Sequence, residues 1–188
     1  MLYAIPVGLL AGFLLGGRLE GLATLRIAWA PIAVLALLVQ VLLFSSPLGG
    51  AVGAAGPAIY VASTAAVLAV VVRNARVPGL AIVALGAVSN LAAIVANGGY
   101  MPADPGALAL AGLDPSRGYS NSIVTNRPLL GPLTDIFALP AGVPMANVFS
   151  IGDLLIGLGI ACTIAFAMRR RGQPRPGPGP LTEGTSPE

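Results

Sequence analysis

Five apolar stretches constrain the fold of this chain more than any other feature of its sequence. They cover residues 2–17, 27–44, 54–72, 77–96 and 149–168. An α-helix needs about 20 apolar residues, within a range of roughly 17–25, to cross the hydrocarbon core of a bilayer. The last four stretches meet this requirement, while the first is slightly short. The sequence therefore predicts an all-α, polytopic transmembrane helix bundle of about five helices.

The composition indicates a protein that is embedded in lipid rather than dissolved in water. Charged residues make up 9% of the 188 residues, whereas about 25% is typical of soluble proteins. A chain of this length suggests one domain. We expect a transmembrane helical domain over residues 1–171, followed by a disordered, Pro- and Gly-rich cytoplasmic tail over residues 172–188.

The arginines predict how the bundle is oriented. All ten basic residues are arginine, and only Arg117 and Arg127 lie between the fourth and fifth stretches. The other eight follow the first, third or fifth stretch: Arg18, Arg26, Arg73, Arg76, Arg169, Arg170, Arg171 and Arg175. Because basic residues stay on the cytoplasmic side, the N-terminus is expected outside and the C-terminus inside. The first stretch has no basic residues before it, which distinguishes it from a secretory signal.

A long outer loop over residues 97–148 separates the fourth and fifth stretches. It is rich in Pro, Gly, Asn and Ser, yet it carries apolar runs at 107–113 and 136–139. Such a loop could lie on the outer membrane surface or fold back into the bundle. Exposing the apolar runs to water would cost about 25 cal/mol per Å². We therefore expect the loop to be mostly ordered and packed on the outer ends of the helices.

The residue types that are missing exclude several kinds of chemistry. The chain has no His, no Lys and a single cysteine, Cys162. These absences exclude Ser-His and Cys-His nucleophiles, His-ligated zinc, a Schiff base, a P-loop lysine and a disulfide. No metal and no cofactor are expected. No nucleic acid is expected either, since the arginines lie at membrane borders rather than on one soluble face. The expected partner is the lipid bilayer, and a further lipid or membrane protein is an open alternative.

Two carboxylates are the candidate catalytic residues. Asp153 begins the last apolar stretch, and Asp135 lies upstream on the same outer side. An acidic residue at the mouth of a membrane helix suggests function. Two carboxylates that meet cannot both ionise, so one can act as base toward water and the other as acid toward a carbonyl. Burial would raise the pKa of Asp135. The structural alternative is a capping box of Ser150 and Asp153, which leaves Asp135 unexplained.

Other polar and small residues could support such a site. Asn90 lies inside the fourth stretch, where it either makes an interhelical hydrogen bond or orients a ligand or a carboxylate. Asn97, Gly98 and Gly99 end that stretch in a pattern typical of a helix C-cap. Two small-residue pairs predict close helix packing: Gly12-x-x-x-Gly16 and Gly157-x-x-x-Ala161.

Three segments together resemble a bacterial polytopic membrane family of unknown function, domain of unknown function 5317. They are NGGYMP at 97–102, LTD at 133–135 and FSIGD at 149–153. The resemblance covers most of the chain before the tail. It implies a small multi-pass protein of the bacterial cytoplasmic membrane and no established activity.

A more distant resemblance is local. FSIGD at 149–153 is similar to the Phe-Asn-x-Ala-Asp motif that opens the last helix of signal peptidase II, the aspartyl lipoprotein signal peptidase, and GAVSNL at 86–91 looks like its Gly-Ala-x-Gly-Asn-Leu segment. That family has another Asp upstream, as Asp135 is here. Ser150, however, stands where the family has Asn, and Ala93 stands where it has Asp. The resemblance implies an Asp135/Asp153 dyad.

Two functions follow as hypotheses. The favoured one is a non-catalytic binding or structural component of the membrane. The alternative is a membrane-embedded aspartyl hydrolase that uses Asp135 and Asp153. A transporter is less favoured, because the sequence shows neither an internal repeat nor charge at the membrane midplane.

Overall fold

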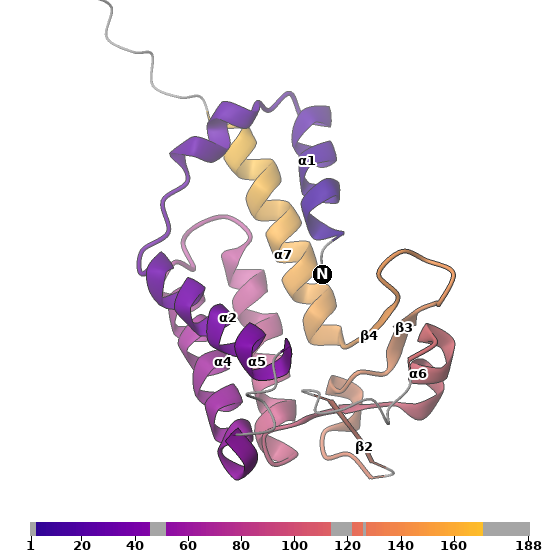
Figure 1. The fold of residues 1–188 in the computed structure, drawn as a ribbon. Helices are drawn as coiled ribbons and strands as arrows, with labels where there is room; N and C mark the ends of the chain where they lie inside the picture. Colours follow the sequence, from indigo (N-terminus) through magenta and orange to yellow (C-terminus); the bar gives the residue numbers. More distant parts are fainter. Residues whose placement is uncertain (1–2, 46–51, 114–121, 126, 171–188) are drawn as a thin grey trace, which may run out of the picture.

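Helices form most of the described chain. The computed structural model describes residues 3–45, 52–113, 122–125 and 127–170 (Figure 1). The long helices are α1 (Ala4–Leu14), α2 (Ala30–Ser45), α4 (Gly56–Arg73), α5 (Leu80–Ala96) and α7 (Ile151–Met168). Each overlaps one of the five apolar stretches of the sequence. The tail predicted to be disordered lies outside the described residues, as do Arg117, Arg171 and Arg175.

Two of these helices are long and apolar enough to cross a membrane. One is α7, with 18 residues, and the other is α4 together with the short 3-10 helix η2 (Gly53–Ala55), with 21 residues. The helices α1, α2 and α5 are apolar but shorter. At 1.5 Å per residue, the 11 residues of α1 extend about 16 Å, roughly half of a 30 Å hydrocarbon core. The first apolar stretch therefore forms a shorter helix than its sequence suggested.

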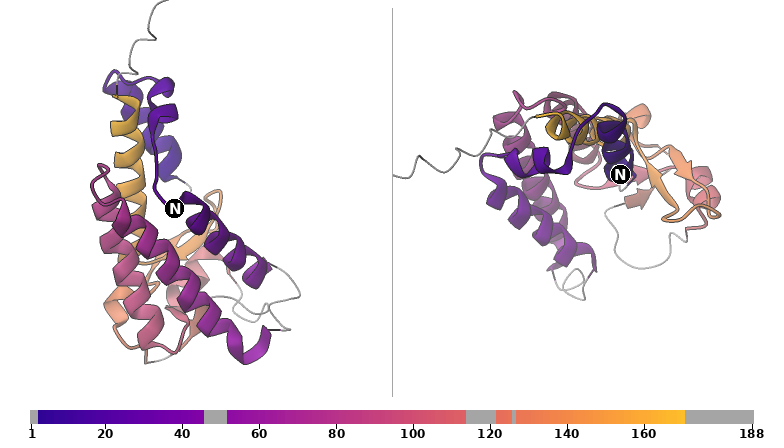
Figure 2. Two further views of the ribbon diagram at one scale, coloured as in Figure 1. Left: turned by 90° about the vertical axis from the view of Figure 1, so that its left-hand side faces the viewer. Right: turned by 90° about the horizontal axis from the view of Figure 1, so that it is seen from above.

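The long helices form an open row rather than a closed bundle. Along this row α1 packs on α7, α7 on α5, α5 on α4, and α4 on α2. The helices α1 and α2 follow each other in the chain through the 3-10 helix η1 (Leu19–Thr24), yet they lie at opposite ends of the row. Figure 2 shows α2 inclined away from the pair α1 and α7.

Contacts between helix ends show that consecutive long helices alternate in direction. Asn74, after α4, donates its Nδ2 hydrogen to the carbonyl of Ala28, before α2, at 2.9 Å. Gly79, before α5, packs on Thr163 near the end of α7, so α5 and α7 are antiparallel. Gly8 packs on Ala161 and Gly12 packs on Met168, so α1 runs parallel to α7.

Because the helices alternate in direction, the first, third and fifth stretches all end at the same end of the molecule. The described arginines that follow these stretches lie there, and we call it the arginine end. They are Arg18, Arg26, Arg73, Arg76, Arg169 and Arg170. The remaining described arginine, Arg127, belongs to the segment between α5 and α7 at the opposite end. The structure thus separates the same two groups of arginines that the sequence separated.

The segment between α5 and α7 folds into a compact cap. Its elements are β1 (Met101–Ala103), α6 (Pro105–Ala111), β2 (Ser122–Val124), η3 (Gly131–Leu133), β3 (Phe137–Leu139) and β4 (Asn147–Phe149). Strands β1 and β2 pair in parallel, and β3 and β4 form an antiparallel hairpin. The purely all-α prediction was therefore wrong for the cap. The described part of the predicted outer loop is ordered, and its two apolar runs contribute α6 and β3.

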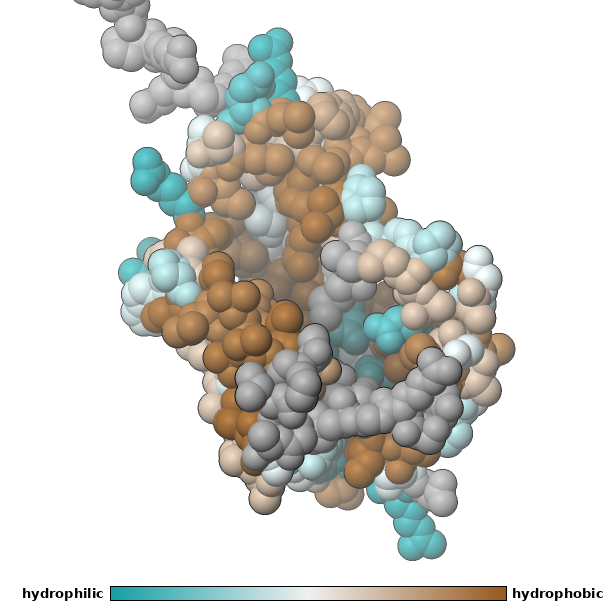
Figure 3. All heavy atoms as spheres, in the orientation of Figure 1, coloured by the Kyte–Doolittle hydropathy of each residue, from teal (hydrophilic) through white to brown (hydrophobic). Residues whose placement is uncertain are grey.

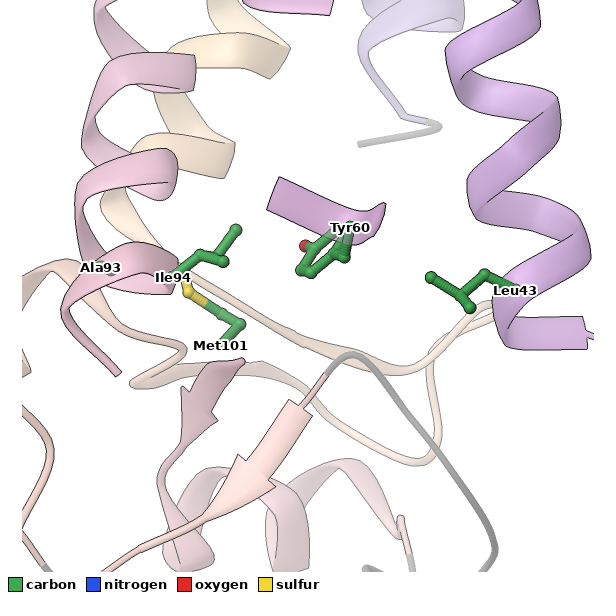
Figure 4. Close-up of a cluster of buried hydrophobic side chains, with 5 residues drawn as sticks. All are labelled: Leu43, Tyr60, Ala93, Ile94 and Met101. Carbon is green, nitrogen blue, oxygen red and sulfur yellow. The ribbon is translucent and has the colours of Figure 1, made fainter. Parts of the chain in front are cut away.

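Two apolar clusters hold the cap together and fasten it to the helices. Within the cap, α6 packs on the hairpin through a buried cluster: Ala103, Ala107, Leu108, Ala111 and Val148. A second cluster joins the ends of α2, α4 and α5 to β1 (Figure 4): Leu43, Tyr60, Ala93, Ile94 and Met101. Phe44 meets the ring of Tyr60 edge-on, with 5.0 Å between ring centroids. The cap is thus packed on one end of the helical row.

The predicted C-cap of α5 is confirmed. The Gly99 N–H donates to the carbonyl of Ile94 at 2.8 Å, and Gly98 and Gly99 have φ of 74° and 91°, which glycine adopts without strain. Asn97 accepts a hydrogen bond from the Leu129 N–H and donates one to the Leu129 carbonyl, both at 2.9 Å. These bonds fix the start of the cap to the end of α5.

Apolar residues cover much of the face of the molecule that Figure 3 shows, and the long helices expose many large apolar side chains. Leu35, Leu85, Leu154 and Leu158 are each more than half exposed. Monomeric soluble proteins rarely expose contiguous apolar patches larger than a few hundred Å². A surface of this kind requires an apolar environment or a partner.

Candidate functional site

The first turn of α7 is closed by a capping box. The Asp153 N–H donates to Ser150 Oγ at 3.0 Å, and the Ser150 N–H donates to Asp153 Oδ2 at 3.1 Å. Ser150 is the N-cap of α7 and is fully buried. The capping interpretation of these two residues is therefore confirmed.

Asn90 on α5 joins this cap from the neighbouring helix. Its Nδ2 group donates to Asp153 Oδ1 at 3.0 Å, and the Ser150 hydroxyl donates to Asn90 Oδ1 at 2.8 Å. Asn90, Ser150 and Asp153 thus form a closed ring of hydrogen bonds. Because both oxygens of Asp153 accept hydrogen bonds, the ring suits an ionised carboxylate, which can only accept.

Glycines allow α5 and α7 to approach closely enough for this ring. A Cβ on Gly152 would overlap Asn90 Oδ1, and a Cβ on Gly86 would overlap the Gly152 carbonyl oxygen. Small residues at helix contacts are the usual means by which apolar helices pack closely. The two small-residue pairs of the sequence predict contacts only in part: Gly12 packs on Met168, but nothing lies within 4 Å of a Cβ placed on Gly16.

Asp135 is held in the cap beside this ring. Its N–H donates to the Pro102 carbonyl at 3.0 Å, and its carbonyl accepts from the Asp104 N–H at 2.9 Å. The side chain is 6% exposed, and Oδ1 has no hydrogen-bond partner among the described residues. Burial, and next the charge of Asp153, raise the pKa of Asp135 from 3.8 to about 7. The two carboxyl groups therefore lie close enough to interact electrostatically.

A groove beside Asp153 exists because α1 is short. Ala4, the first residue of α1, lies beside Gly157, so the first turns of α7 are left without a neighbour on this side. The hairpin β3–β4 closes the outer end, where the Tyr3 hydroxyl donates to the Pro144 carbonyl at 2.5 Å. The space left between α1, the hairpin and α7 is about 300 Å³. We call it the Asp153 groove.

The walls of the Asp153 groove are apolar except at its outer end. Leu139 and Phe149 come from the hairpin, and Leu154 and Leu158 come from α7. Tyr3 and Asp153 supply polar groups, and Asp153 also borders an adjoining cavity of about 240 Å³ along the hairpin. The arrangement can hold an apolar chain with its polar end near a carboxylate.

The structure joins some of the predicted site residues and separates others. It brings Asn90, Ser150 and Asp153 into direct contact, with Asp135 nearby. By contrast, Asn97, Gly98 and Gly99 form the C-cap of α5 and make no contact with this ring among the hydrogen bonds described above. Within the described residues, no group of three or more His, Cys, Asp or Glu is placed to hold a metal ion.

Sequence reasoning missed the residues that shape the groove. Tyr3 and the hairpin residues Leu139 and Phe149 line it. Tyr3 had one usable signal, because a tyrosine at the end of an apolar stretch is typical of the membrane interface. The hairpin residues had none, since their position depends on pairing between β3 and β4.

The chain belongs to a protein family of unknown function. The sequence profile of this family, DUF5317, matches residues 24–165, about three quarters of the chain. The predicted resemblance to this family is therefore confirmed. No curated protein and no solved structure matches the chain, and the local resemblance to signal peptidase II is not shown by these comparisons.

The family match includes the hydrogen-bonded ring but not the whole groove. Asn90, Asp135, Ser150 and Asp153 all lie within residues 24–165, whereas helix α1, which forms one wall of the groove, lies before them. The groove thus combines residues of the matched range, among them Asp153, with Tyr3, Ala4 and Val7, which precede it.

Proposed function

We propose that the protein is a multi-pass component of the bacterial cytoplasmic membrane, with its N-terminus outside and its C-terminus inside. The proposal is supported by the alternating directions of the five long helices, by their apolar outer faces and by the arginines gathered at one end. Helix α1 is too short to span alone, so the bilayer beside it must thin, or the cap must extend into it.

Topology is tested with reporter fusions. Fusions after Arg76 and after Arg170 are expected to read as cytoplasmic, and a fusion after Leu113 is expected to read as external. An external signal from either arginine fusion would contradict the five-helix orientation.

For a protein with this membrane topology, we propose a non-catalytic binding function at the Asp153 groove. The observation that carries it is an apolar groove of about 300 Å³ that ends at one carboxylate. None of the groove-lining residues is an arginine, so an anionic head group would meet only negative charge. The ligand class that fits is an amphipathic molecule with one apolar chain and a cationic or hydrogen-bond-donating head.

Binding is tested with two probes of equal chain length, dodecylamine and dodecanoate, added to the full chain in lipid nanodiscs. Dodecylamine is expected to raise the apparent Tm more than dodecanoate does. Gly157→Leu fills the groove and should remove the difference. Gly157→Ala is the matched control, because a Cβ there meets only Ala4 Cβ at 3.9 Å. Equal effects of the two probes, or an effect that survives Gly157→Leu, would exclude this binding site.

A second candidate function, an aspartyl membrane hydrolase, is favoured by the state of Asp135. A buried carboxyl whose pKa is raised to about 7, with an unpaired oxygen, can hold a proton near neutral pH. Asp153, which accepts two hydrogen bonds, would act as the base toward water. Asp135 would then donate its proton to the oxygen of the scissile carbonyl while the water oxygen bonds to its carbon. The C–N bond would break as the amine takes the proton held by Asp153 and the carbonyl re-forms by returning a proton to Asp135.

The hydrolase is tested by cleavage of membrane-anchored peptides. Asp135→Asn and Asp153→Asn are each expected to abolish cleavage while the protein remains folded. If Asp153 acts only as a cap, its loss costs about 0.5–2 kcal/mol of stability and nothing else. Absence of cleavage by the unaltered protein would leave the binding function alone.

A further inference from the structure

A second cavity, at the arginine end, is lined by basic residues from two distant parts of the sequence. Arg18 comes from the segment after α1, and Arg169 and Arg170 come from the end of α7. The cavity measures about 740 Å³ and also borders Glu20. It lies at the opposite end of α7 from the Asp153 groove and shares no lining residue with it.

The convergence of these arginines is built into the packing of the chain. Gly16, with φ of 75°, ends α1 and turns the chain toward α7. The Arg18 N–H then donates to the Met168 carbonyl at 2.8 Å. Gly21 must lack a side chain, because a Cβ there would overlap the Ala167 carbonyl oxygen. These contacts hold the backbone of Arg18 against the backbone that carries Arg169 and Arg170.

The charges in the cavity are not balanced. Three arginines and one acidic residue, Glu20, border it, and the described residues form no ion pair in this cavity. Arginines near the ends of α1 and α7 also complement the helix dipoles. That role explains a positive charge beside each helix end. It does not explain why arginines from two segments border one cavity large enough to admit a ligand.

We propose that this cavity binds a phosphate group, supplied by the head group of an anionic phospholipid. Guanidinium groups match phosphate oxygens with paired N–H donors, and three of them exceed the charge of Glu20 by two. Leu15 and Met168 border the same cavity, and these apolar side chains can contact the acyl chains of a lipid whose head group lies in the cavity. The lipid source rests on the proposed membrane orientation, whereas the phosphate chemistry does not.

The experiment uses the full chain in nanodiscs of phosphatidylcholine. One arm adds phosphatidylglycerol to the discs, and the other adds inorganic phosphate to the buffer. In each arm the apparent Tm is read from the reaction of Cys162, the single cysteine, with a thiol-reactive dye. The unaltered protein is expected to gain stability as the phosphate source is increased.

Variants then locate the site. Arg18→Gln and the double variant Arg169→Gln/Arg170→Gln are expected to bind about fivefold more weakly for each arginine removed. Arg76→Gln is the matched control, because Arg76 is exposed at the same end of the molecule but does not line the cavity. Arg18→Lys keeps the charge but loses the paired N–H donors, so it too should bind phosphate more weakly than the unaltered protein. It replaces Arg18→Gln in the test if that variant fails to fold.

The outcomes separate the two sources from a general charge effect. Loss of the phosphatidylglycerol effect in the cavity variants, with Arg76→Gln unchanged, supports the lipid head group. The same pattern with inorganic phosphate alone supports the phosphate site but assigns it to a soluble ligand. Equal losses in Arg76→Gln and in the cavity variants would overturn the proposal, because the arginines would then act only through the surface potential. Absence of stabilisation in both arms would overturn it as well.

Discussion

Asp135 makes the stability of the protein depend on pH. Its pKa is raised from 3.8 to about 7 by burial and by the charge of Asp153. In the unfolded chain the carboxyl loses its proton near pH 4, but in the folded protein it keeps the proton until about pH 7. The unfolded state therefore binds fewer protons between these values, and the free energy of unfolding falls as pH rises. At 1.36 kcal/mol per pKa unit, the loss approaches about 4 kcal/mol above pH 7.

Asp135→Asn isolates this effect. The amide resembles the protonated carboxyl in shape but cannot ionise, so the variant should lack this part of the pH dependence. Between pH 5 and pH 7, we expect the stability of the variant to rise relative to that of the unaltered protein by about 2 kcal/mol. The apparent Tm, read from the reactivity of Cys162, measures it in nanodiscs.

Asp104→Asn is the control for this measurement. Asp104 belongs to the same cap but is exposed, and its side chain accepts the Ala107 N–H as the N-cap of α6. Asn caps helices about as well as Asp, so little change is expected at any pH. A constant loss of stability in Asp135→Asn from pH 5 to pH 8 would refute the reasoning. The Asp135 carboxyl would then serve a structural hydrogen bond rather than hold a proton.

Three further predictions concern the contacts of the site. Asn90→Ala removes a hydrogen-bond partner from the buried Ser150 hydroxyl and from the half-buried Asp153 carboxylate, and should cost about 1–3 kcal/mol, measured as a lower apparent Tm. Gly152→Ala should destabilise the protein by at least as much, because its Cβ would overlap Asn90 Oδ1, whereas Gly142→Ala, with open space around it, should be neutral. Tyr3→Phe removes the hydrogen bond to the Pro144 carbonyl and should cost about 0.5–1.5 kcal/mol; an unchanged Tm would show that this bond does not hold α1 to the hairpin.

The long helices could be predicted from sequence because their signal is local. Each apolar stretch produces a helix, and the capping box at Ser150 and the C-cap at Gly98 and Gly99 lie where their motifs indicate. The four short strands could not be predicted in this way. Each has three residues, too few to show an alternating pattern, and β1 pairs with β2 across about twenty residues of chain.

The site was predictable only in its residue types. The sequence singled out Asn90, Asp135 and Asp153 as polar groups that need partners. It could not show that Asn90 reaches Asp153, since this depends on how closely α5 and α7 approach. That approach is set by Gly86 and Gly152, and glycines are so frequent in this chain that their spacing alone does not identify a contact.

The direction of the hydrogen bonds in the ring assigns different roles to the two carboxyl groups. The Ser150 hydroxyl donates to Asn90 Oδ1, so the Nδ2 group of Asn90 must face Asp153. Asp153 consequently accepts at both oxygens and has no need of a proton, while Asp135 receives no such donor at Oδ1. A proton shared near these two groups therefore belongs on Asp135. Replacing Asn90 with Asp would remove the hydrogen-bond donor to Asp153 and place a second negative charge beside it. Asn90→Asp should therefore lower the apparent Tm more than Asn90→Ala does.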